Sequence, residues 1–359
     1  MRKLRIGVIG AGSFAKTCHI PGLQSHPQAE VVVLCGRRYD HARNIADQLN
    51  VPEVMTDFRE VCARSDLDAL TIAAPNMEHA AVALAALAEG KHVFCEKPLG
   101  MTVAEARNML RAGDASGKIH QVAFTFRYGY GIRELKRRVH QGDIGEPYYV
   151  RIQYDGWDGL KADWQTGWRE KQALAGGGVL FDVGSHLFDI VRYILGPIDM
   201  VSGFLHRVPR QRMERESGKL ANVETDDLAV VSFCHDNGVH GQWFFSRVSP
   251  KFAENGYVEV IGPQGALKAS LSRGTVDVLK VSVPADPEWK ELRLAEEAYD
   301  GQSHCLGRMM RSFVDACLRG KLDADEDASF DDGLAAQRGL AAVIQSQQSY
   351  RWVALREAQ

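Results

Sequence analysis

The sequence predicts two domains of different fold class. Residues 1–124 form an α/β domain with a parallel sheet, and residues 125–359 form an α+β domain whose sheet is mostly antiparallel. Three observations lead to this prediction. The chain has 359 residues, more than one compact core usually holds. Its first third alternates short β-branched runs with amphipathic stretches. The remainder carries successive strand patterns separated by turn signals, with few helices between them.

In the first domain, short apolar runs rich in β-branched residues predict the strands Leu4–Ile9, Val31–Cys35, Ala69–Ala73, His92–Cys95 and Gln121–Phe124. His41–Leu49 and Glu78–Glu89 lie between these runs and have helical patterns. Continuous apolar strands that alternate with helices are typical of a parallel sheet covered on both faces.

In the second domain, the predicted strands are Tyr148–Tyr154, Leu228–Cys234, Gly241–Ser246, Tyr257–Ile261 and Val276–Val283. Two helices are expected, Val179–Leu195 and Cys305–Arg319, the latter ending at Gly320. Residues 209–226 are polar and charged, and this composition predicts a loop. One face of the antiparallel sheet is expected to pack on the helices.

Composition excludes several classes of partner. The 43 basic and 46 acidic side chains leave a net charge of −3, which gives no electrostatic reason to expect nucleic acid or a membrane surface. No apolar run is long enough to predict a membrane span. The seven cysteines are scattered and form no Cys-x-x-Cys pair, a pattern typical of reduced thiols in the cytoplasm. The acidic stretch 323–332 lacks the Gly and terminal Glu of a calcium loop, so it predicts a solvated loop and helix start and no metal site.

The segment from Gly10 to Ala15 follows a predicted strand directly and can open a helix. Its pattern is G-x-G-x-x-A, in which the first glycine permits a tight turn and the second lets the backbone approach a pyrophosphate. Ala15 is small enough for helix–strand packing, and Ser13 and Phe14 lie at the positive end of the helix dipole. The segment therefore predicts a bound dinucleotide.

The end of the second strand bears on the choice between NAD and NADP. An acid there binds the ribose 2′-hydroxyl, whereas a 2′-phosphate requires that acid to be absent and a cation to be near. The sequence has Gly36, Arg37 and Arg38 at this point. Because arginine makes paired, charge-assisted bonds to phosphate, NADP is favoured, with NAD as the alternative if both arginines are solvated loop charges.

Two further segments carry candidate chemistry. Glu96, Lys97 and Pro98 follow a parallel strand, and ligands bind outside the carboxyl ends of such strands, so Lys97 is expected to face a nicotinamide. In the second segment, three glycines at 176–178 precede a helix on which Asp182, His186, Asp189 and Tyr193 form a narrow polar stripe. Asp182 and His186 are four residues apart, and a carboxylate beside an imidazole suits proton transfer near neutral pH.

These three segments, in this order, resemble the Gfo/Idh/MocA family (glucose–fructose oxidoreductase, inositol dehydrogenase and rhizopine catabolism) over essentially the whole chain. The resemblance implies a Rossmann domain followed by an α+β domain with a large open sheet that often mediates dimers or tetramers. It implies that Lys97, Asp182 and His186 are the catalytic set. It also extends to candidate cofactor contacts at Pro75, Asn76, His79, Glu96, Lys97 and Arg169. One departure is Gly36, where many NAD-using members carry an acid.

The resemblance implies interconversion of a secondary alcohol and a ketone on a sugar, inositol or related polyol. His186 would remove the hydroxyl proton, Asp182 would orient His186, and Lys97 would stabilise the developing alkoxide. Candidate substrate contacts beyond these three are Arg127 and Trp157, with Tyr128, Trp164, Arg169 and His304 as weaker candidates. Two alternatives stay open: a glycosidase that uses transient oxidation by NAD, and a non-catalytic NADP-binding regulatory protein.

Overall fold

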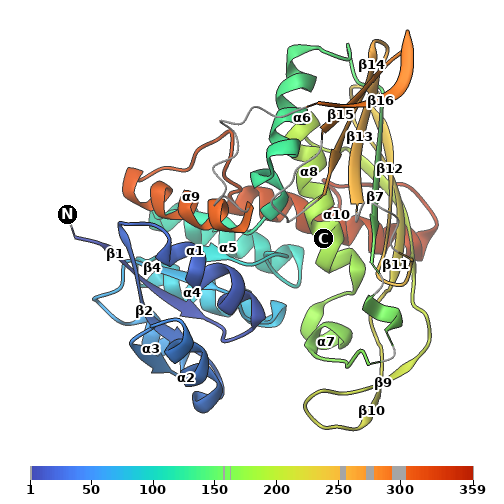
Figure 1. Cartoon of the computed structure of the whole chain (residues 1–359). Coiled ribbons are helices and arrows are strands. Elements are labelled where there is room, and N and C mark those ends of the chain that lie inside the picture. Colours follow the sequence, from blue (N-terminus) through green and yellow to red (C-terminus); the bar gives the residue numbers. More distant parts are fainter. Residues whose placement is uncertain are drawn as a thin grey trace. The chain divides into compact units, whose positions relative to one another are not determined.

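The computed structural model describes residues 2–156, 158–161, 163–250, 256–271, 279–292 and 305–358. The chain forms two compact units (Figure 1). The first comprises Met1–Thr125 with Gln302–Leu334, and the second comprises Phe126–Gly301 with Ala335–Gln359. A single boundary after residue 124 therefore leaves out residues 302–334, which pack with the first unit although they lie far along the chain.

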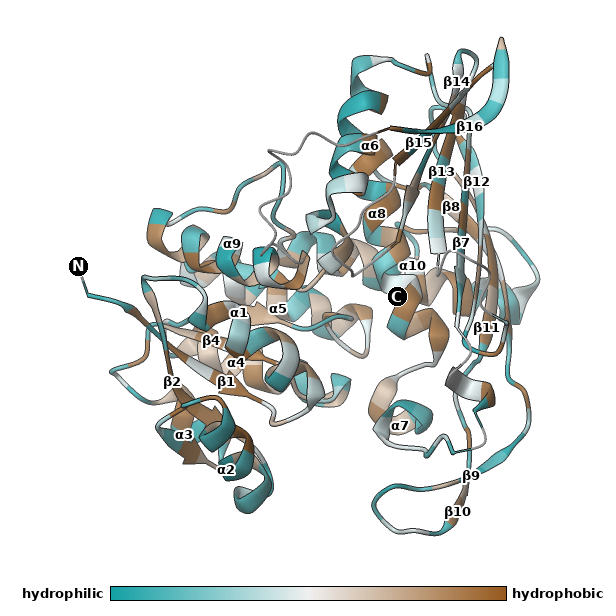
Figure 2. Ribbon diagram, viewed as in Figure 1, coloured by the Kyte–Doolittle hydropathy of each residue, from teal (hydrophilic) through white to brown (hydrophobic). Residues whose placement is uncertain are grey.

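The first unit is built on a six-stranded parallel sheet in the order β3-β2-β1-β4-β5-β6, which confirms the predicted α/β fold. The strands are β1 Leu4–Ile9, β2 Ala29–Cys35, β3 Glu53–Met55, β4 Ala69–Ile72, β5 His92–Cys95 and β6 His120–Val122. The helices are α1 Ile20–Gln24, α2 Tyr39–Gln48, α3 Phe58–Cys62, α4 His79–Ala88, α5 Val103–Ser116 and α9 Cys305–Arg319. Strands β1, β2 and β4 are mostly hydrophobic along their length (Figure 2), as expected where helices cover both faces.

Residues 305–334 join the first unit through close backbone packing. A Cβ added to Gly22 of α1 would lie 2.7 Å from Cγ of Met310 in α9, so the glycine lets the two helices approach. The amide of Val122 donates to the carbonyl of Ala328 over 2.8 Å, and Gln121 forms an antiparallel bridge with Ser329 beside β6. The sequence gives no sign of this pairing because residues 320–329 lack a strand pattern.

Asp327 is an exception to the prediction that the acidic stretch is solvated, whereas Asp323 and Asp325 are exposed as expected. Its carboxylate is buried and accepts hydrogen bonds from the hydroxyl of Ser312 (2.5 Å) and the amide of Asp323 (2.8 Å). These bonds offset the cost of removing the charge from water. Asp327 is therefore a structural anchor of the segment.

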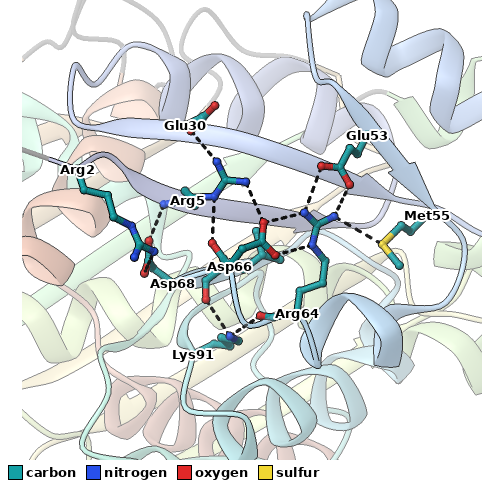
Figure 3. Close-up of polar contacts among 10 residues, drawn as sticks. Arg2, Arg5, Glu30, Glu53, Met55, Arg64, Asp66, Asp68 and Lys91 are labelled. Atoms are coloured by element: carbon teal, nitrogen blue, oxygen red, sulfur yellow. Dashed lines mark hydrogen bonds and ion pairs between the residues drawn. The ribbon is translucent and has the colours of Figure 1, made fainter.

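A network of charged side chains joins the amino ends of the parallel strands (Figure 3). Asp66, in the turn before β4, accepts from Arg5 Nη2 and from Arg64 Nη2, each over 2.8 Å. Arg64 also pairs with Glu53. Nζ of Lys91, just before β5, donates to the carbonyls of Arg64 (2.6 Å) and Leu67 (2.8 Å). The network fixes the turns that enter β1, β4 and β5.

The second unit contains a nine-stranded sheet in the order β16-β15-β14-β13-β7-β12-β11-β8-β17. Its strands are β7 Tyr149–Asp155, β8 Met200–His206, β11 Leu228–Cys234, β12 His240–Ser246, β13 Gly256–Gly262, β14 Gly265–Ser270, β15 Leu279–Val283, β16 Asp286–Leu292 and β17 Val353–Ala354. Among these strands, β7 and β12 pair in parallel, and all other neighbouring strands pair antiparallel. The predicted large, mostly antiparallel sheet is confirmed.

Helices pack on one face of this sheet (Figure 1). They are α6 Tyr130–Gln141, α8 Ser185–Leu195 and α10 Phe330–Ser349, while α7 is the short helix Gln172–Ala175. Glycines let the layers approach: a Cβ on Gly203 of β8 would lie 2.7 Å from Val343 Cγ1 of α10. The opposite face carries a cross-strand row, Phe204–Val230–Phe244, in which Phe204 is 55% and Val230 is 40% exposed.

Two local predictions differ from the structure. The polar stretch 209–226, predicted as a loop, contains a short hairpin of β9 Gln211–Met213 and β10 Leu220–Asn222. Its strands are too short and polar to show an alternating pattern. The predicted helix Val179–Leu195 begins with a π-helical turn, Leu180–Gly184, before α8. Within the described residues, the segment Gln172–Leu195 is long and apolar enough to qualify as a membrane span, but 78% of its apolar window is buried, as in a core helix.

Candidate active site

The glycine loop lies at the carboxyl end of β1, between β2 and β4. Gly10 has φ +105°, and a Cβ there would lie 2.4 Å from the carbonyl oxygen of Ala73, so both conformation and packing require glycine. At Gly12, by contrast, an added Cβ would meet only the same oxygen, at 4.0 Å. Packing against the described residues therefore does not explain Gly12, and the close approach of a pyrophosphate stays its predicted role.

The helix after this loop has an unusual first turn. Ala15–His19 is π-helical and continues into α1, and Ala15 is fully buried. The predicted helix and its small residue at position 15 are both present. Ser13 is exposed and Phe14 is half-buried, so their main chain lies at the accessible start of the helix.

The tip of β2 has no room for a side chain at position 36. A Cβ on Gly36 would lie 2.7 Å from Cβ of Ala11 and 3.1 Å from Cβ of Ala42. Arg37 and Arg38 are exposed, and Arg38 precedes the first residue of α2. Nε2 of His41 lies 3.0 Å from the carbonyl of Ala11, which ties α2 to the glycine loop.

The segment after β4 holds Pro75, Asn76 and His79. Asn76 is buried at the start of the short 3₁₀ turn Asn76–Glu78. His79 is fully buried, and its ring nitrogens lie 2.9 Å from the carbonyl of Pro98 and 3.0 Å from that of Ala74. Both ring nitrogens face main-chain oxygens, so the side chain links the loops that hold Ala74 and Pro98, and a contact of His79 with the cofactor stays a prediction.

Glu96 and Lys97 lie directly after β5, at the same edge of the sheet. Glu96 is buried, and its Oε1 lies 3.1 Å from Nε2 of His19 in the π-helical turn. Burial raises the pKa of Glu96, but the hydrogen bond and charge of His19, with the charge of Lys97, outweigh burial and hold that pKa below its usual range. Lys97 is half-buried, and its amide lies 3.4 Å from Oε2 of Glu96.

In the second unit, the glycine run packs against a residue that sequence reasoning missed. A Cβ on Gly178 would lie 1.9 Å from the carbonyl oxygen of Asp226, which confirms that close backbone approach requires glycine here. The Asp226 carboxylate accepts from the amides of Gly178 (2.6 Å) and Leu180 (2.8 Å) and so caps the following helical turn. Burial raises the pKa of Asp226, and these two amide bonds oppose the rise.

Asp182 and His186 have different surroundings. The Asp182 side chain is 39% exposed, whereas His186 is 1% exposed and its ring lies edge-on to Phe126 at 4.9 Å between centroids. Asp182 lies in the π-helical turn and His186 in α8, so the simple i, i+4 geometry of one α-helix does not apply to them. The predicted polar stripe is largely buried, since Asp189 and Tyr193 are buried as well.

Arg247 is a second residue that the sequence did not indicate. It directly follows β12, and its Nη1 lies 3.4 Å from Oε1 of Glu170 while its Nη2 lies 3.8 Å from Oδ2 of Asp182. Glu170 in turn accepts from the amide of Gly167 over 2.8 Å. A forked cation therefore connects Asp182 to a buried glutamate. Only the fold brings position 247 to this helix start.

The remaining candidates of the second unit have separate positions. Arg127 is buried and pairs with Asp189, with Nε 2.9 Å from both carboxylate oxygens. The guanidinium of Arg169 is exposed and lies 4.4 Å from the ring centroid of Trp168. Tyr128 is buried in the core, and Trp164 is half-buried. Trp157 and His304 lie outside the described residues.

The structure thus gathers two sets of candidate residues, one in each unit. In the first, the glycine loop, Arg37, Asn76 and Lys97 follow β1, β2, β4 and β5 at one edge of the sheet. In the second, the glycine run, Asp182 and His186 share one helix start. Within the described residues, no three His, Cys, Asp or Glu side chains gather as a metal site.

Comparison with known proteins agrees with both units. Residues 4–124 match the model of an oxidoreductase family with an NAD-binding Rossmann fold, and residues 132–268 match the C-terminal domain of Gfo/Idh/MocA proteins. The chain belongs to the Gfo/Idh/MocA family of oxidoreductases.

Family members similar to this chain are named as sugar dehydrogenases. Levoglucosan dehydrogenase from Pseudarthrobacter phenanthrenivorans is 26% identical over 86% of this chain and 83% of its own. D-glucoside 3-dehydrogenase from Escherichia coli is 25% identical over 96% of this chain and 95% of its own. The solved structure of levoglucosan dehydrogenase with NADH and levoglucosan covers 99% of this chain and 100% of its own, with a TM-score of 0.90 at 23% identity. The Gfo/Idh/MocA fold therefore extends over nearly the whole chain.

Proposed function

We propose that this Gfo/Idh/MocA oxidoreductase interconverts a secondary alcohol and a ketone on a sugar, inositol or related polyol. The observation that carries the proposal is the pairing of two features at one sheet edge. One is Gly12, where an added Cβ would meet, among the residues that the structure describes, just the carbonyl oxygen of Ala73 at 4.0 Å. The other is Lys97, which follows β5 at the same edge. Relatives named as sugar dehydrogenases support the substrate class.

The residues of the first unit fit a nicotinamide dinucleotide. Gly12, Ser13 and Phe14 would hold the pyrophosphate through main-chain amides, and Pro75, Asn76 and Glu96 would border the rest of the cofactor. When bound, the nicotinamide supplies hydride transfer. Arg169 of the second unit stays a predicted cofactor contact.

The catalytic roles follow from side-chain chemistry. In the oxidative direction, His186 takes the proton from the substrate hydroxyl, and Lys97 donates a charge-assisted hydrogen bond to the alkoxide that develops. Asp182 orients His186, and Nη2 of Arg247 lies 3.8 Å from Oδ2 of Asp182 and so supports the position of this carboxylate. Arg127 and Trp157 stay predicted substrate contacts, Arg127 with its guanidinium already bound to Asp189.

NADP is the favoured cofactor. An acid at position 36 would need a Cβ 2.7 Å from that of Ala11, so the ribose-binding carboxylate of NAD enzymes does not fit. Arg37 and Arg38 are exposed at the start of α2, where a 2′-phosphate would meet both guanidinium groups and the helix amino end. We expect the double change Arg37→Ala, Arg38→Ala to lower kcat/KM for NADP at least about 10-fold and to leave that for NAD within about 2-fold.

The decisive experiment is a screen of aldoses, inositols, sugar lactones and ketoses with NADP and with NAD, read by the absorbance of the reduced nicotinamide. We expect NADP-linked turnover of at least one polyol, abolished in the Lys97→Ala variant. A clear preference for NAD contradicts the roles of Arg37 and Arg38. Glycoside cleavage with no net change in reduced nicotinamide identifies transient oxidation instead, and cofactor binding without turnover identifies a regulatory protein.

We also propose that the chain forms a homodimer or homotetramer through the face of the nine-stranded sheet that carries the exposed side chains of Phe204 and Val230. The exposed row Phe204–Val230–Phe244 gives this face an apolar centre. Val230→Glu is expected to dissociate the oligomer, and light scattering during gel filtration measures the mass. A wild-type monomer at micromolar concentration contradicts the proposal.

The cytoplasm is the proposed location. All seven cysteines are free thiols, and all but Cys234 are buried. Buried free thiols suit a reducing compartment. Cell fractionation with an antibody to the chain tests this, and recovery outside the cytoplasm contradicts it.

A further inference from the structure

The 3₁₀ turn Thr125–Tyr128 contacts α8 at two residues, His186 and Asp189. The ring of Phe126 lies edge-on to the His186 imidazole, with 4.9 Å between centroids. The guanidinium of Arg127 binds the Asp189 carboxylate, with Nε 2.9 Å from both oxygens and Nη2 2.5 Å from Oδ1. Phe126 and Arg127 are consecutive, and Asp189 follows His186 by three residues on the same helix, so the four side chains form a closed ring of contacts.

The ring of contacts is buried within the second unit. Among Phe126, Arg127, His186 and Asp189, no side chain is more than 4% exposed. Tyr193, one turn beyond Asp189 in α8, adds an aromatic face whose centroid lies 4.9 Å from Cζ of Arg127. The guanidinium is therefore held by a carboxylate and an aromatic ring of the same helix.

Stability alone does not account for a buried ion pair at this place. Replacing such a pair by apolar side chains of similar size often leaves stability unchanged or improves it, because both charges lose their hydration on burial. What the Arg127–Asp189 pair provides is orientation, since a fork that contacts both carboxylate oxygens permits few relative positions. The carbonyl of Phe126 also accepts from the amide of Gly129, the residue before α6, over 3.1 Å. The ring of Phe126 is thus fixed from both ends of its turn.

We propose that Arg127 and Asp189 are positioning residues of the reaction, because their ion pair holds the ring of Phe126 against His186 and so fixes the orientation of the imidazole. The inference rests on the proposed role of His186 as the group that takes the substrate proton. Proton transfer requires the accepting nitrogen to lie within hydrogen-bond distance of the hydroxyl, so an imidazole free to rotate reacts more slowly. This role does not require Arg127 to contact the substrate.

The test measures how well Phe126 shields His186 in the full-length protein, without substrate or cofactor. Diethyl pyrocarbonate modifies neutral imidazoles, and it is used at pH 8, above the usual pKa of histidine. Mass spectrometry of the tryptic peptide 172–192, whose one histidine is His186, gives the rate of modification. His235, another buried histidine of the second unit, reports in the same digest whether a variant opens this unit as a whole.

Two variants and their combination trace the effect from the ion pair to the imidazole. Phe126→Ala is expected to raise the modification rate of His186 at least about 10-fold, because the covering ring is removed. Asp189→Asn removes the charge that the Arg127 fork binds, and is expected to raise this rate at least about 3-fold. Since the pair acts through Phe126, the double variant is expected to match Phe126→Ala alone. The rate at His235 is expected to stay unchanged throughout.

Steady-state kinetics separates positioning from substrate binding. Asp189→Asn is expected to lower kcat about 10-fold and to leave KM for the polyol within about 2-fold, because the orientation of His186 is lost while the substrate contacts remain. If Asp189→Asn does not fold, the double change Arg127→Met, Asp189→Leu fills the buried space without charges. It is expected to raise the labelling of His186 in the same way.

The matched control is Asp227→Asn. Asp227 is also fully buried in the second unit, but its Oδ1 binds Nη2 of Arg210 over 2.6 Å. The control is expected to leave the labelling of His186 unchanged.

Three results overturn the inference: wild-type labelling of His186 when the ion pair is removed, equal rises in Asp189→Asn and Asp227→Asn, or a double variant labelled faster than Phe126→Ala. Absence of polyol turnover in the wild type defeats the proposed function but leaves the labelling result intact.

Discussion

The two ends of the six-stranded sheet are built on opposite principles. At the amino ends, Arg5, Arg64, Asp66 and Lys91 bind one another or main-chain carbonyls and close the turns (Figure 3). At the carboxyl ends, glycines replace side chains and arginines at the tip of β2 are exposed. The difference indicates that the two ends of the sheet have different roles. The amino ends stabilise the fold, because their polar groups are bonded within the protein, whereas we infer that the carboxyl ends keep space and hydrogen-bond donors for a ligand.

The two lysines that flank β5 give the sharpest test of this comparison. Lys97→Ala is expected to lower kcat about 1,000-fold, because it removes the donor to the developing alkoxide. Cofactor affinity, measured by fluorescence titration, is expected to change less than about 5-fold. Stability is expected to be nearly unchanged, since Lys97 is only half-buried. Retention of kcat within 10-fold of wild type removes Lys97 from the proposed mechanism.

Two glycines of the cofactor loop are expected to have different roles, Gly10 in stability and Gly12 in cofactor binding. Gly10→Ala forces a side chain into φ +105° against the backbone of Ala73, and is expected to destabilise the protein by at least about 2 kcal/mol. Gly12→Ala meets open space and is expected to keep stability but to weaken cofactor binding at least about 10-fold. Thermal unfolding and titration with the reduced cofactor measure the two effects. Equal effects of both changes on stability contradict the assignment of Gly12 to a ligand.

Lys91→Met tests the stabilising role of the charged network at the amino ends of the strands. Lys91 is 7% exposed, and its loss removes the short hydrogen bonds to the carbonyls of Arg64 and Leu67, leaving Arg64 with the 3.4 Å bond from the amide of Leu67. We expect a loss of about 2 kcal/mol in the free energy of unfolding with kcat unchanged. Urea denaturation and steady-state kinetics on the same preparation check both. A fall in kcat without a loss of stability breaks the division between the two ends.

The sequence predicts a feature of the fold or the site when the residues that form it lie close together along the chain. The glycine loop, Lys97 and the strand ends are local patterns, because one strand, one turn and one helix define each of them. Gly178 must be glycine because its backbone packs closely against that of Asp226. The run of glycines predicts a close backbone contact at this point, but it does not identify Asp226 as the residue contacted. Neither Asp226 nor Arg247 carries a local signal, since the sheet of the second unit brings them to the helix start from 46 or more residues away.

The His19–Glu96 pair and the turn at Asp182 show the same limit. His19 and Glu96 are 77 residues apart and meet only because β1 and β5 flank β4 in the sheet. The π-helical turn at Leu180–Gly184 alters the spacing that a regular helix predicts for Asp182 and His186. Hydrophobic periodicity finds the helix but does not report a local change in its winding.

Arg247→Lys tests whether Arg247 supports the position of Asp182 in the second unit. Lysine keeps the charge but lacks the fork that reaches both Glu170 and Asp182. We expect kcat/KM to fall about 5-fold, with cofactor affinity unchanged. Arg151→Lys is the control, because Arg151 pairs with Glu259 in the middle of the sheet. Equal effects of the two changes contradict a specific role of Arg247.

The smallest expected effect concerns pH and distinguishes two aspartates. The hydrogen bonds from Arg64 and then Arg5 hold the pKa of Asp66 well below its usual range. The stability that Asp66 contributes is therefore fully present above its unfolded pKa of about 3.9 and is lost as pH falls through the folded value. Because the Asp66 side chain is 42% exposed, Asp66→Asn is expected to cost only about 1 kcal/mol at pH 7, and less at pH 4.

The contribution of Asp226 to stability changes with pH in the opposite direction. Burial raises its pKa, so the folded state holds its proton more tightly than the unfolded chain, and its contribution to stability falls as pH rises from about 3.9 through the folded value. The difference in unfolding free energy between wild type and Asp226→Asn is thus expected to shrink from pH 4 to pH 7, while that for Asp66→Asn grows. Urea denaturation of the three proteins across this range measures both trends. Parallel trends for the two variants contradict the assignment of one carboxylate to a cation network and the other to a half-buried helix cap.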